Sequence, residues 1–196
     1  MSSKKTSSFS VGPTEALHII ISVVTISLAF TLFPVGSFDF EKFTVVAVTV
    51  GAGFVLHELA HKYFAIKYGA KAEFRAWTWG LFLALAMAFL TNGSFIFAAP
   101  GAVYIFGKIV SKEENGRIAL AGPLVNLLLA TVFIVIGMLA PRLSMLAGTG
   151  VYVNAFLGAF NLIPITPLDG SKVFAWNKLA WATVLLSNLA ILFLLF

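Results

Sequence analysis

The chain has 196 residues, of which 60% are hydrophobic and 11% are charged. Soluble domains contain about 25% charged residues, so this composition excludes an ordinary soluble domain and predicts a polytopic membrane protein. Cysteine is absent, which excludes disulfide bonds, thiolate metal ligands and cysteine nucleophiles. The formal net charge of +5 does not indicate nucleic-acid binding, because the basic residues lie in short loops, as is typical of the cytoplasmic side of a membrane protein.

Residues 1–14 form a polar N-terminal tail that precedes a long apolar run. This combination can imitate a secretory signal peptide, but the run is longer than a signal core and no A-x-A cleavage site follows it. We therefore interpret the run as a retained first membrane span. No internal repeat or low-complexity tract divides the rest of the chain, so we expect a single transmembrane domain over 15–196.

Stretches without Asp, Glu, Lys or Arg mark the expected spans. A transmembrane helix needs about 20 predominantly apolar residues, and most of these stretches are long enough for one crossing. We therefore predict an all-α membrane protein with about six transmembrane helices. The charge-free stretches are 16–38, 43–57, 76–107, 118–141, 143–168 and 179–196.

Clusters of basic residues set the expected orientation. One cluster surrounds the end of the second span, which should cover about 43–66, and another precedes the fourth element at 118–140. The positive-inside rule places both clusters in the cytoplasm, whereas the first loop, 34–42, is expected outside. The basic residues are Lys62, Lys67, Lys71 and Arg75 in the first cluster, and Lys108, Lys112 and Arg117 in the second.

Residues 77–107 must leave the cytoplasmic side and return to it. Their helix-like part, 77–90, is short for a complete crossing, so we expect one short span or a re-entrant helix. The sequence TNGS at 91–94 predicts a turn, and the β-formers around a Pro-Gly pair in 95–107 predict β-like structure. Such backbone is tolerated at membrane depth only where protein or a water-filled cavity satisfies its polar groups.

The C-terminal part contains a predicted break in a helix. The element 118–140 crosses outward, and 145–160 returns to the stretch NLIPITPLDGSK. Pro164 and Pro167 cannot lie inside a regular helix without loss of hydrogen bonds. We therefore expect a proline-broken segment that sets Asp169 on a partly unwound backbone. A last span should cover 179–196.

The sequence HELAH at 57–61 lies in the last two turns of the second span. His57 and His61 are one helical turn apart and share a face, so their imidazoles can bind one Zn²⁺. Glu58 is offset by about 100 degrees, where it can reach a water molecule on the metal without being a ligand. HExxH also occurs by chance in ordinary helices, but His and Glu are disfavoured in a membrane span, which argues against chance here.

A catalytic zinc site needs a third protein ligand and an open position for water. Asp169 is the strongest candidate, because the topology returns it to the side of HELAH. Of the eight acidic residues, only Glu58 and Asp169 fall in segments expected within the membrane. The alternative is that Asp169 caps a helix that begins near Ser171, but this leaves the histidine pair short of a ligand. We predict one zinc ion per chain, bound by His57, His61 and Asp169.

Two further polar residues in the expected spans have open roles. His18, near the inner end of the first span, is interpreted as a polar contact or interfacial side chain, with a fourth ligand or substrate gate as the lesser alternative. Asn126 can donate a hydrogen bond to a developing oxyanion or join neighbouring helices, and the residues alone do not separate these roles.

The motifs HELAH at 57–61, AGPLVN at 121–126 and NLIPITPLDG at 161–170 together resemble the site-2 protease family of intramembrane zinc metalloproteases. The resemblance covers about 43–174. It implies that His57, His61 and Asp169 bind zinc, that Glu58 is the general base, and that Asn126 helps to bind the substrate or the oxyanion. It also implies a β-like sheet at membrane depth after the HELAH helix. The chain departs from the family pattern at Ala60 and Ser171, where glycine is usual.

The expected function is peptide-bond hydrolysis within or near the transmembrane segments of membrane-protein substrates, as in regulated intramembrane proteolysis. The expected partners are transmembrane protein substrates and the lipid bilayer, without nucleic acid. The expected place is the cell membrane, with the active site towards the cytoplasmic side. The main alternative is a non-proteolytic membrane metal-binding protein or metal transporter, because transporters also hold ionisable groups and broken helices at membrane depth.

Overall fold

The structure, a computed structural model, describes residues 9–32 and 39–195. Most of the predicted polar tail and of the first loop therefore lies outside the described residues. The described residues form a helical protein with a small two-stranded sheet. Its elements are α1 (Pro13–Thr31), α2 (Phe40–Lys67), β1 (Lys71–Ala76), α3 (Thr78–Leu90), β2 (Gly101–Phe106), α4 (Lys112–Leu139), η1 (Pro141–Leu143), α5 (Ser144–Asn161), α6 (Asp169–Trp176) and α7 (Lys178–Leu195).

Five helices in the described part of the chain are long and apolar enough to cross a membrane: α1, α2, α4, α5 together with η1, and α7. These helices indicate an integral membrane protein. The predicted count of about six also included 77–90, which forms α3. This helix has 13 residues, fewer than the roughly 20 that a complete crossing needs. This helix is apolar like the other five, but it is shorter than they are.

Two helices begin earlier than the sequence pattern suggested, because side chains cap them. The Asp39 side chain accepts a hydrogen bond from the backbone N–H of Lys42 (3.1 Å), which starts α2 at Phe40. At the start of α4, the Ser111 hydroxyl accepts from the N–H of Glu114 (3.1 Å), and the Glu114 carboxylate accepts from the N–H of Ser111 (2.8 Å). This reciprocal capping box extends α4 into the basic segment that was read as a loop.

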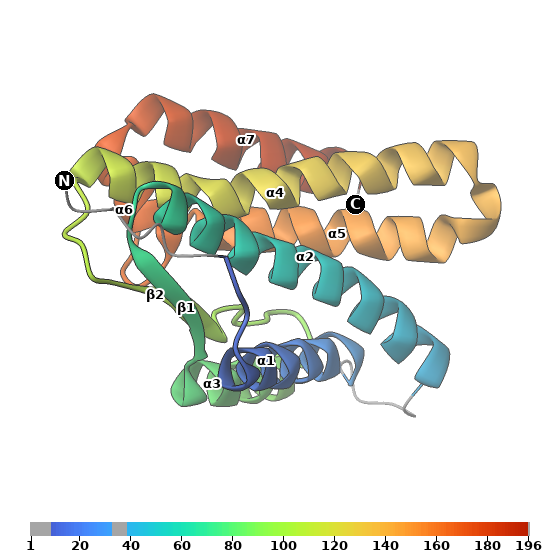
Figure 1. Ribbon diagram of the computed structural model, residues 1–196. Helices are drawn as coiled ribbons and strands as arrows, with labels where there is room; N and C mark the ends of the chain where they lie inside the picture. Colours follow the sequence, from blue (N-terminus) through green and yellow to red (C-terminus); the bar gives the residue numbers. More distant parts are fainter. Residues whose placement is uncertain (1–8, 33–38, 196) are drawn as a thin grey trace.

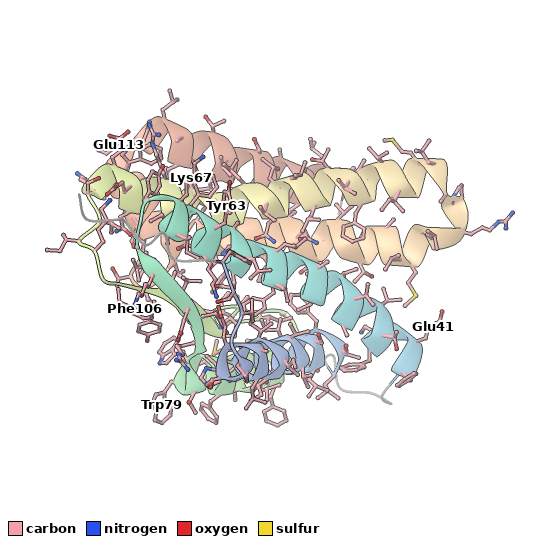
Figure 2. The ribbon with its side chains drawn as sticks, viewed as in Figure 1. Glu41, Tyr63, Lys67, Trp79, Phe106 and Glu113 are labelled. Carbon is pink, nitrogen blue, oxygen red and sulfur yellow. The ribbon has the colours of Figure 1, made fainter. Side chains whose placement is uncertain are left out.

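Figure 1 shows α4, α5 and α7 side by side, with α2 crossing them obliquely and packing against α4 and α5. The helices α1 and α3 and the two strands lie below them in this view. Charged side chains gather at the ends of this arrangement. Figure 2 shows Lys67 at the end of α2 and Glu113 at the start of α4 on one side of the molecule, and Glu41 at the opposite end of α2. The side chains of Trp79 and Phe106 point outward.

The sheet pairs β1 with β2 in antiparallel register, from Lys71 opposite Phe106 to Ala76 opposite Gly101. The β-like structure predicted over 95–107 is therefore confined to 101–106. Its partner strand, β1, was not predicted, because its charged residues were read as part of a cytoplasmic loop. The outer edge of β1 is closed by α1, since Glu15 Oε1 accepts from the N–H of Phe74 (3.0 Å) and His18 Nδ1 accepts from the N–H of Ala76 (3.3 Å).

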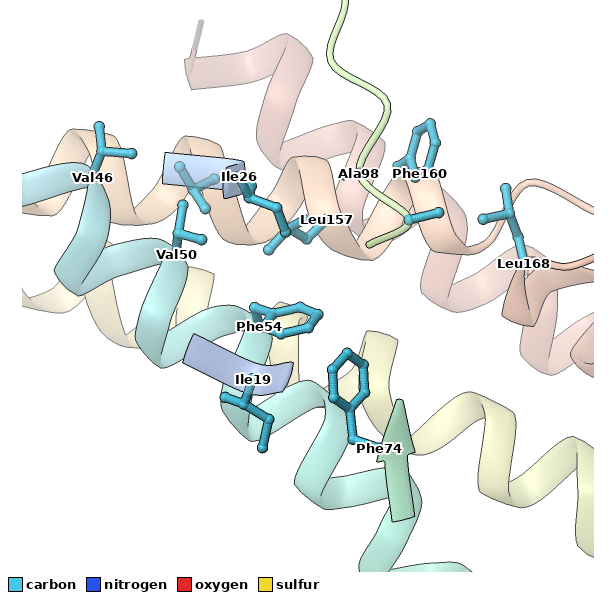
Figure 3. Close-up of a cluster of buried hydrophobic side chains, with 12 residues drawn as sticks. Ile19, Ile26, Val46, Val50, Phe54, Phe74, Ala98, Leu157, Phe160 and Leu168 are labelled. Atoms are coloured by element: carbon cyan, nitrogen blue, oxygen red, sulfur yellow. The ribbon is translucent and has the colours of Figure 1, made fainter. Parts of the chain in front are cut away.

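A cluster of buried apolar side chains connects the sheet to the helices (Figure 3). The rings of Phe54 on α2 and Phe74 on β1 meet edge to face, with centroids 5.4 Å apart. Lipid tails are as apolar as these side chains, so the cluster stabilises the fold by close packing rather than by removal from water. Its other members are Ile19, Ile26, Val46, Val50, Ala98, Ala99, Val153, Leu157, Phe160 and Leu168.

A buried ion pair adds a polar connection between α1 and α2. The Lys62 ammonium donates to Glu15 Oε2 (2.5 Å) and to the carbonyl oxygen of Ser10 (2.5 Å), and both charged side chains are almost fully buried. A buried charge needs a paired and hydrogen-bonded partner. The pair therefore holds the start of α1 against the turn of α2 that follows His61.

We expect the Glu15→Ala variant to be strongly destabilised, because it leaves the Lys62 ammonium buried without a counter-charge. Breaking one side of a buried pair costs about 3–5 kcal/mol. The midpoint of thermal unfolding in detergent micelles measures this effect. The control is Glu113→Ala, which breaks the exposed Glu113–Arg117 pair and should leave the midpoint nearly unchanged. Equal midpoints in the two variants would contradict the stabilising role of the Glu15–Lys62 pair.

Candidate metal centre

Two distant segments of the chain bring three potential metal ligands together. His57 and His61 lie in the last turns of α2, and Asp169 is the first residue of α6. Asp169 Oδ2 is 3.3 Å from His57 Nε2 and 2.9 Å from His61 Nε2. The three ligand atoms lie within 4.8 Å of one another, and all three residues are buried. The structure thus places the three predicted ligand residues around one point.

The hydrogen-bond partners of the two imidazoles fix their tautomers. His61 Nδ1 is 2.7 Å from the carbonyl oxygen of Ile118, which can only accept, so Nδ1 carries the hydrogen. His57 Nδ1 is 2.6 Å from Asn126 Oδ1, which also accepts. In a neutral imidazole, one nitrogen then carries the hydrogen and the other a lone pair. Both Nε2 atoms therefore present lone pairs to the same carboxylate oxygen.

This arrangement fits a divalent metal ion. Two nitrogen lone pairs and a carboxylate oxygen repel one another unless a cation lies among them. Histidines that bind a metal usually donate their other ring N–H to a carbonyl or carboxylate, as both imidazoles do here. The Lys172 ammonium, 3.2 Å from Asp169 Oδ1, adds a positive charge that favours the ionised carboxylate.

The irregular segment before α6 determines where Asp169 points. Residues 162–168 contain Pro164 and Pro167 and form no regular helix, in agreement with the predicted break. The residue that caps α6 is Leu168, and the Asp169 carboxylate does not serve as the cap. Its Oδ2 atom faces the histidines instead, while Oδ1 accepts from the Lys172 ammonium (3.2 Å). The structure therefore does not support the alternative that Asp169 only caps a helix.

Glu58 lies beside these ligands but is not one of them. Its side chain is buried, and its Oε2 atom has no hydrogen-bond partner among the described residues. Leaving a buried carboxylate oxygen unpartnered costs free energy, which suggests that another molecule completes its hydrogen bonds. A cavity of about 300 Å³ provides the space, because Glu58, His61 and Asp169 all line it.

The cavity also brings in residues that the sequence analysis did not single out. Asn161, Lys172 and most of β2 line it. Asn161 is the last residue of α5, and its amide donates to the carbonyl oxygen of Leu157 (3.0 Å). It is also the first residue of the stretch NLIPITPLDG, which was the signal that could have identified it. The position of Lys172 in the sequence does not by itself place it in the site, because its contact with Asp169 Oδ1 depends on the conformation of the Asp169 side chain.

Asn126 is fully buried next to His57, and both its side-chain oxygen and its side-chain NH₂ group make hydrogen bonds. Its Oδ1 atom accepts from His57 Nδ1, and its Nδ2 atom donates to the carbonyl oxygen of Gly53 (3.2 Å) and to Asn154 Oδ1 (3.1 Å). An oxyanion would need an N–H of this amide that is not already donated. In this structure the amide therefore connects α4 to α2 and α5.

His18 lies apart from the metal ligands. Its Nδ1 atom accepts from the N–H of Ala76, and it is not part of the group of potential ligands found among the described residues. The structure thus gives His18 the polar contact that was the preferred interpretation, and the contact helps to close the edge of β1.

Comparison with known proteins identifies two relatives from Methanocaldococcus jannaschii. The chain is 43% identical over 173 residues to a protein named "Putative zinc metalloprotease", and the match covers 87% of this chain and 88% of that protein. It is 32% identical over 126 residues to a second protein, named "Zinc metalloprotease", with 61% of this chain and 30% of that protein covered. No protein-family model matches the sequence, and no solved structure matches it significantly.

We expect Gly122→Ala to impair metal binding although Gly122 contributes no ligand. A Cβ atom at this position of α4 would lie 2.5 Å from His57 Nε2, so the imidazole would have to leave its present position beside Asp169. Elemental analysis of the purified variant measures the bound metal per chain. Gly148→Ala on α5 is the control, because a Cβ atom there meets no atom within 4 Å. Metal contents equal to that of the wild type in both variants would contradict the assigned position of His57.

Proposed function

The chain belongs to a family of zinc metalloproteases, and on this premise we propose that it is an intramembrane zinc metalloprotease of the site-2 type. It hydrolyses peptide bonds within or near the transmembrane segments of membrane-protein substrates. One observation carries the proposal: two imidazoles and one carboxylate converge in a cavity beside the unpartnered carboxylate of Glu58. The five long apolar helices support action on substrates inside a membrane.

In the proposed site, His57, His61 and Asp169 hold one zinc ion. Three protein ligands leave a coordination position open, which distinguishes catalytic from structural zinc sites. When bound, zinc lowers the pKa of a water molecule to about 7 and polarises the scissile carbonyl group. Asp169 would hold the metal through Oδ2, because this atom faces the two imidazoles whereas Oδ1 accepts from the Lys172 ammonium.

Glu58 moves the proton in this mechanism. Its unpartnered Oε2 atom accepts a proton from the attacking water molecule, and the protonated carboxyl then gives the proton to the leaving amine. Burial shields Glu58 from bulk water, so the groups that exchange protons with it are those inside the cavity. For Asn126 we propose positioning of His57 rather than donation to the oxyanion, since both of its amide hydrogens are already donated.

The free edge of β2 offers a place for an extended substrate segment. Alternate residues of an antiparallel strand direct their backbone groups to opposite sides. The N–H groups of Phe74 and Ala76 face α1, so their partners across the ladder, Val103 and Gly101, direct theirs away from β1. Gly101 and Val103 are among the residues that line the cavity. A substrate helix must unwind before its carbonyl groups can react, and pairing with β2 would compensate for the hydrogen bonds that it loses.

The proposal includes the arrangement in the membrane. We propose that residues 15–196 form one multi-pass domain in the cell membrane, with the site towards the cytoplasm. The histidines lie near the end of α2 that carries Lys67 (Figure 2), and the Lys108 ammonium donates to the carbonyl oxygen of Tyr68 (2.9 Å) at the same end. The positive-inside rule assigns such an end to the cytoplasmic side.

Glu58→Gln tests the proposed mechanism, because the amide keeps the shape of the side chain but cannot accept the proton. We expect this variant to retain zinc and to lose cleavage of a single-span model substrate in vesicles, by at least about 100-fold. Gel analysis and mass spectrometry measure the extent and position of cleavage. Glu41→Gln is the control. Glu41 is exposed at the other end of α2, so the same change there should leave both the zinc content and the cleavage unchanged.

Full cleavage by Glu58→Gln would refute the assigned general base. A wild-type protein that holds zinc, cleaves no membrane substrate and carries metal ions into vesicles would refute the protease and favour the transporter alternative. Cleavage sites far from the transmembrane segment of the substrate would leave a metalloprotease but contradict its intramembrane type.

A further inference from the structure

A chain of buried amides extends from the proposed metal site to a residue of α5 that lies outside the sequence motifs. Asn154 on α5 donates from Nδ2 to the carbonyl oxygen of Gly150 (2.8 Å) and accepts at Oδ1 from Asn126 Nδ2 (3.1 Å). Asn126 Oδ1 in turn lies 2.6 Å from His57 Nδ1. Asn126 and Asn154 are fully buried, and His57 is 3% exposed, so bulk water does not compete for these bonds.

Backbone carbonyl groups fix the direction of every bond in this chain. The carbonyl oxygen of Gly150 can only accept, so the NH₂ group of Asn154 faces it and the side-chain oxygen of Asn154 faces Asn126. The NH₂ group of Asn126 faces this oxygen and the carbonyl oxygen of Gly53. The oxygen of Asn126 must therefore face His57, which places the hydrogen on Nδ1 and the lone pair on Nε2.

The geometry points to Asn154 as a positioning residue for the metal site. By fixing the amide of Asn126, it holds the His57 imidazole in the tautomer and orientation that present Nε2 to the metal. Without Asn154, one of the two acceptors that orient the Asn126 amide is lost, and the amide can rotate to present its NH₂ group to His57. The inference rests on the proposed function, because it concerns the same metal site.

Close approach of α2 and α5 makes this contact possible. A Cβ atom on Gly53 would lie 2.5 Å from Asn154 Oδ1, so any larger residue would displace the amide of Asn154. The chain contains a second pair with the same local geometry. Asn188 on α7 is also fully buried and donates to a carbonyl oxygen four residues earlier (2.9 Å), and a Cβ atom on Gly158 would lie 2.5 Å from its Oδ1 atom.

This second pair supplies matched controls, because Asn188 Oδ1 has no hydrogen-bond partner among the described residues and so makes no hydrogen bond to a proposed metal ligand or to Asn126. We expect Asn154→Ala to weaken zinc binding by about 10-fold or more, as is typical when a partner of a metal-bound histidine is removed. Gly53→Ala should weaken it as well, with Asn154 still present. Asn188→Ala and Gly158→Ala should bind zinc as tightly as the wild type.

The measurement is zinc affinity of the full-length protein in detergent, by competition with a chelating dye, together with the thermal unfolding midpoint of each metal-free variant. If Asn154 acts through Asn126, adding Asn154→Ala to Asn126→Ala should not weaken zinc binding further, although each single change does. Variants that do not fold are identified by the unfolding midpoint, and Gly53→Ala then provides the second test.

Three results would overturn the inference: wild-type zinc affinity in both Asn154→Ala and Gly53→Ala, an equal loss in the Asn188 and Gly158 controls, or additive losses in the double variant. These results are distinct from failure of the proposed function. A wild-type protein that binds zinc without cleaving substrate would refute the protease but leave the role of Asn154 in metal binding intact.

Discussion

The arrangement of α2, α4, α5 and α6 depends on one electrostatic constraint: two imidazole lone pairs face a single carboxylate oxygen. The carbonyl oxygen of Ile118 and the side chain of Asn126 keep the hydrogens of His61 and His57 on Nδ1. The Nε2 atoms and Asp169 Oδ2 then repel one another until a cation joins them. In the proposed metal site, zinc binding is therefore coupled to helix packing, because the ligands lie on α2 and α6 and the residues that orient them lie on α4 and α5.

Few charged side chains are buried in this apolar protein, and the pair formed by Glu15 and Lys62 shows how two of them are accommodated. Lys62 directly follows His61, yet its ammonium is directed to Glu15 on α1 rather than into the cavity. Glu15 also accepts the N–H of Phe74, so the pair orients β1 relative to α2. Because β2 is paired with β1, the same contact sets the distance between the free strand edge and Glu58.

Much of the architecture could be predicted from local patterns, and the failures have identifiable causes. The capping box at Ser111 and Glu114 lengthened α4, because two reciprocal hydrogen bonds outweighed the loop-like charge pattern. The strand β1 was missed because its charged side chains resemble those of a loop, whereas its pairing with β2 is a long-range contact. The buried Glu15–Lys62 pair was likewise hidden, since nothing in the spacing of two charges 47 residues apart reveals that they meet.

The sequence alone determined the apolar helices and the shared face of His57 and His61, and it predicted Asp169 as the third ligand. These conclusions follow from periodicity, composition and the scarcity of acidic residues in apolar segments, which are local properties. Only the tertiary structure decided what surrounds those residues: the acceptors that fix the imidazoles, the strand edge along the cavity, and the amide of Asn154. Such contacts depend on the relative placement of helices that are far apart in the chain, and no local pattern encodes the direction of a hydrogen bond between them.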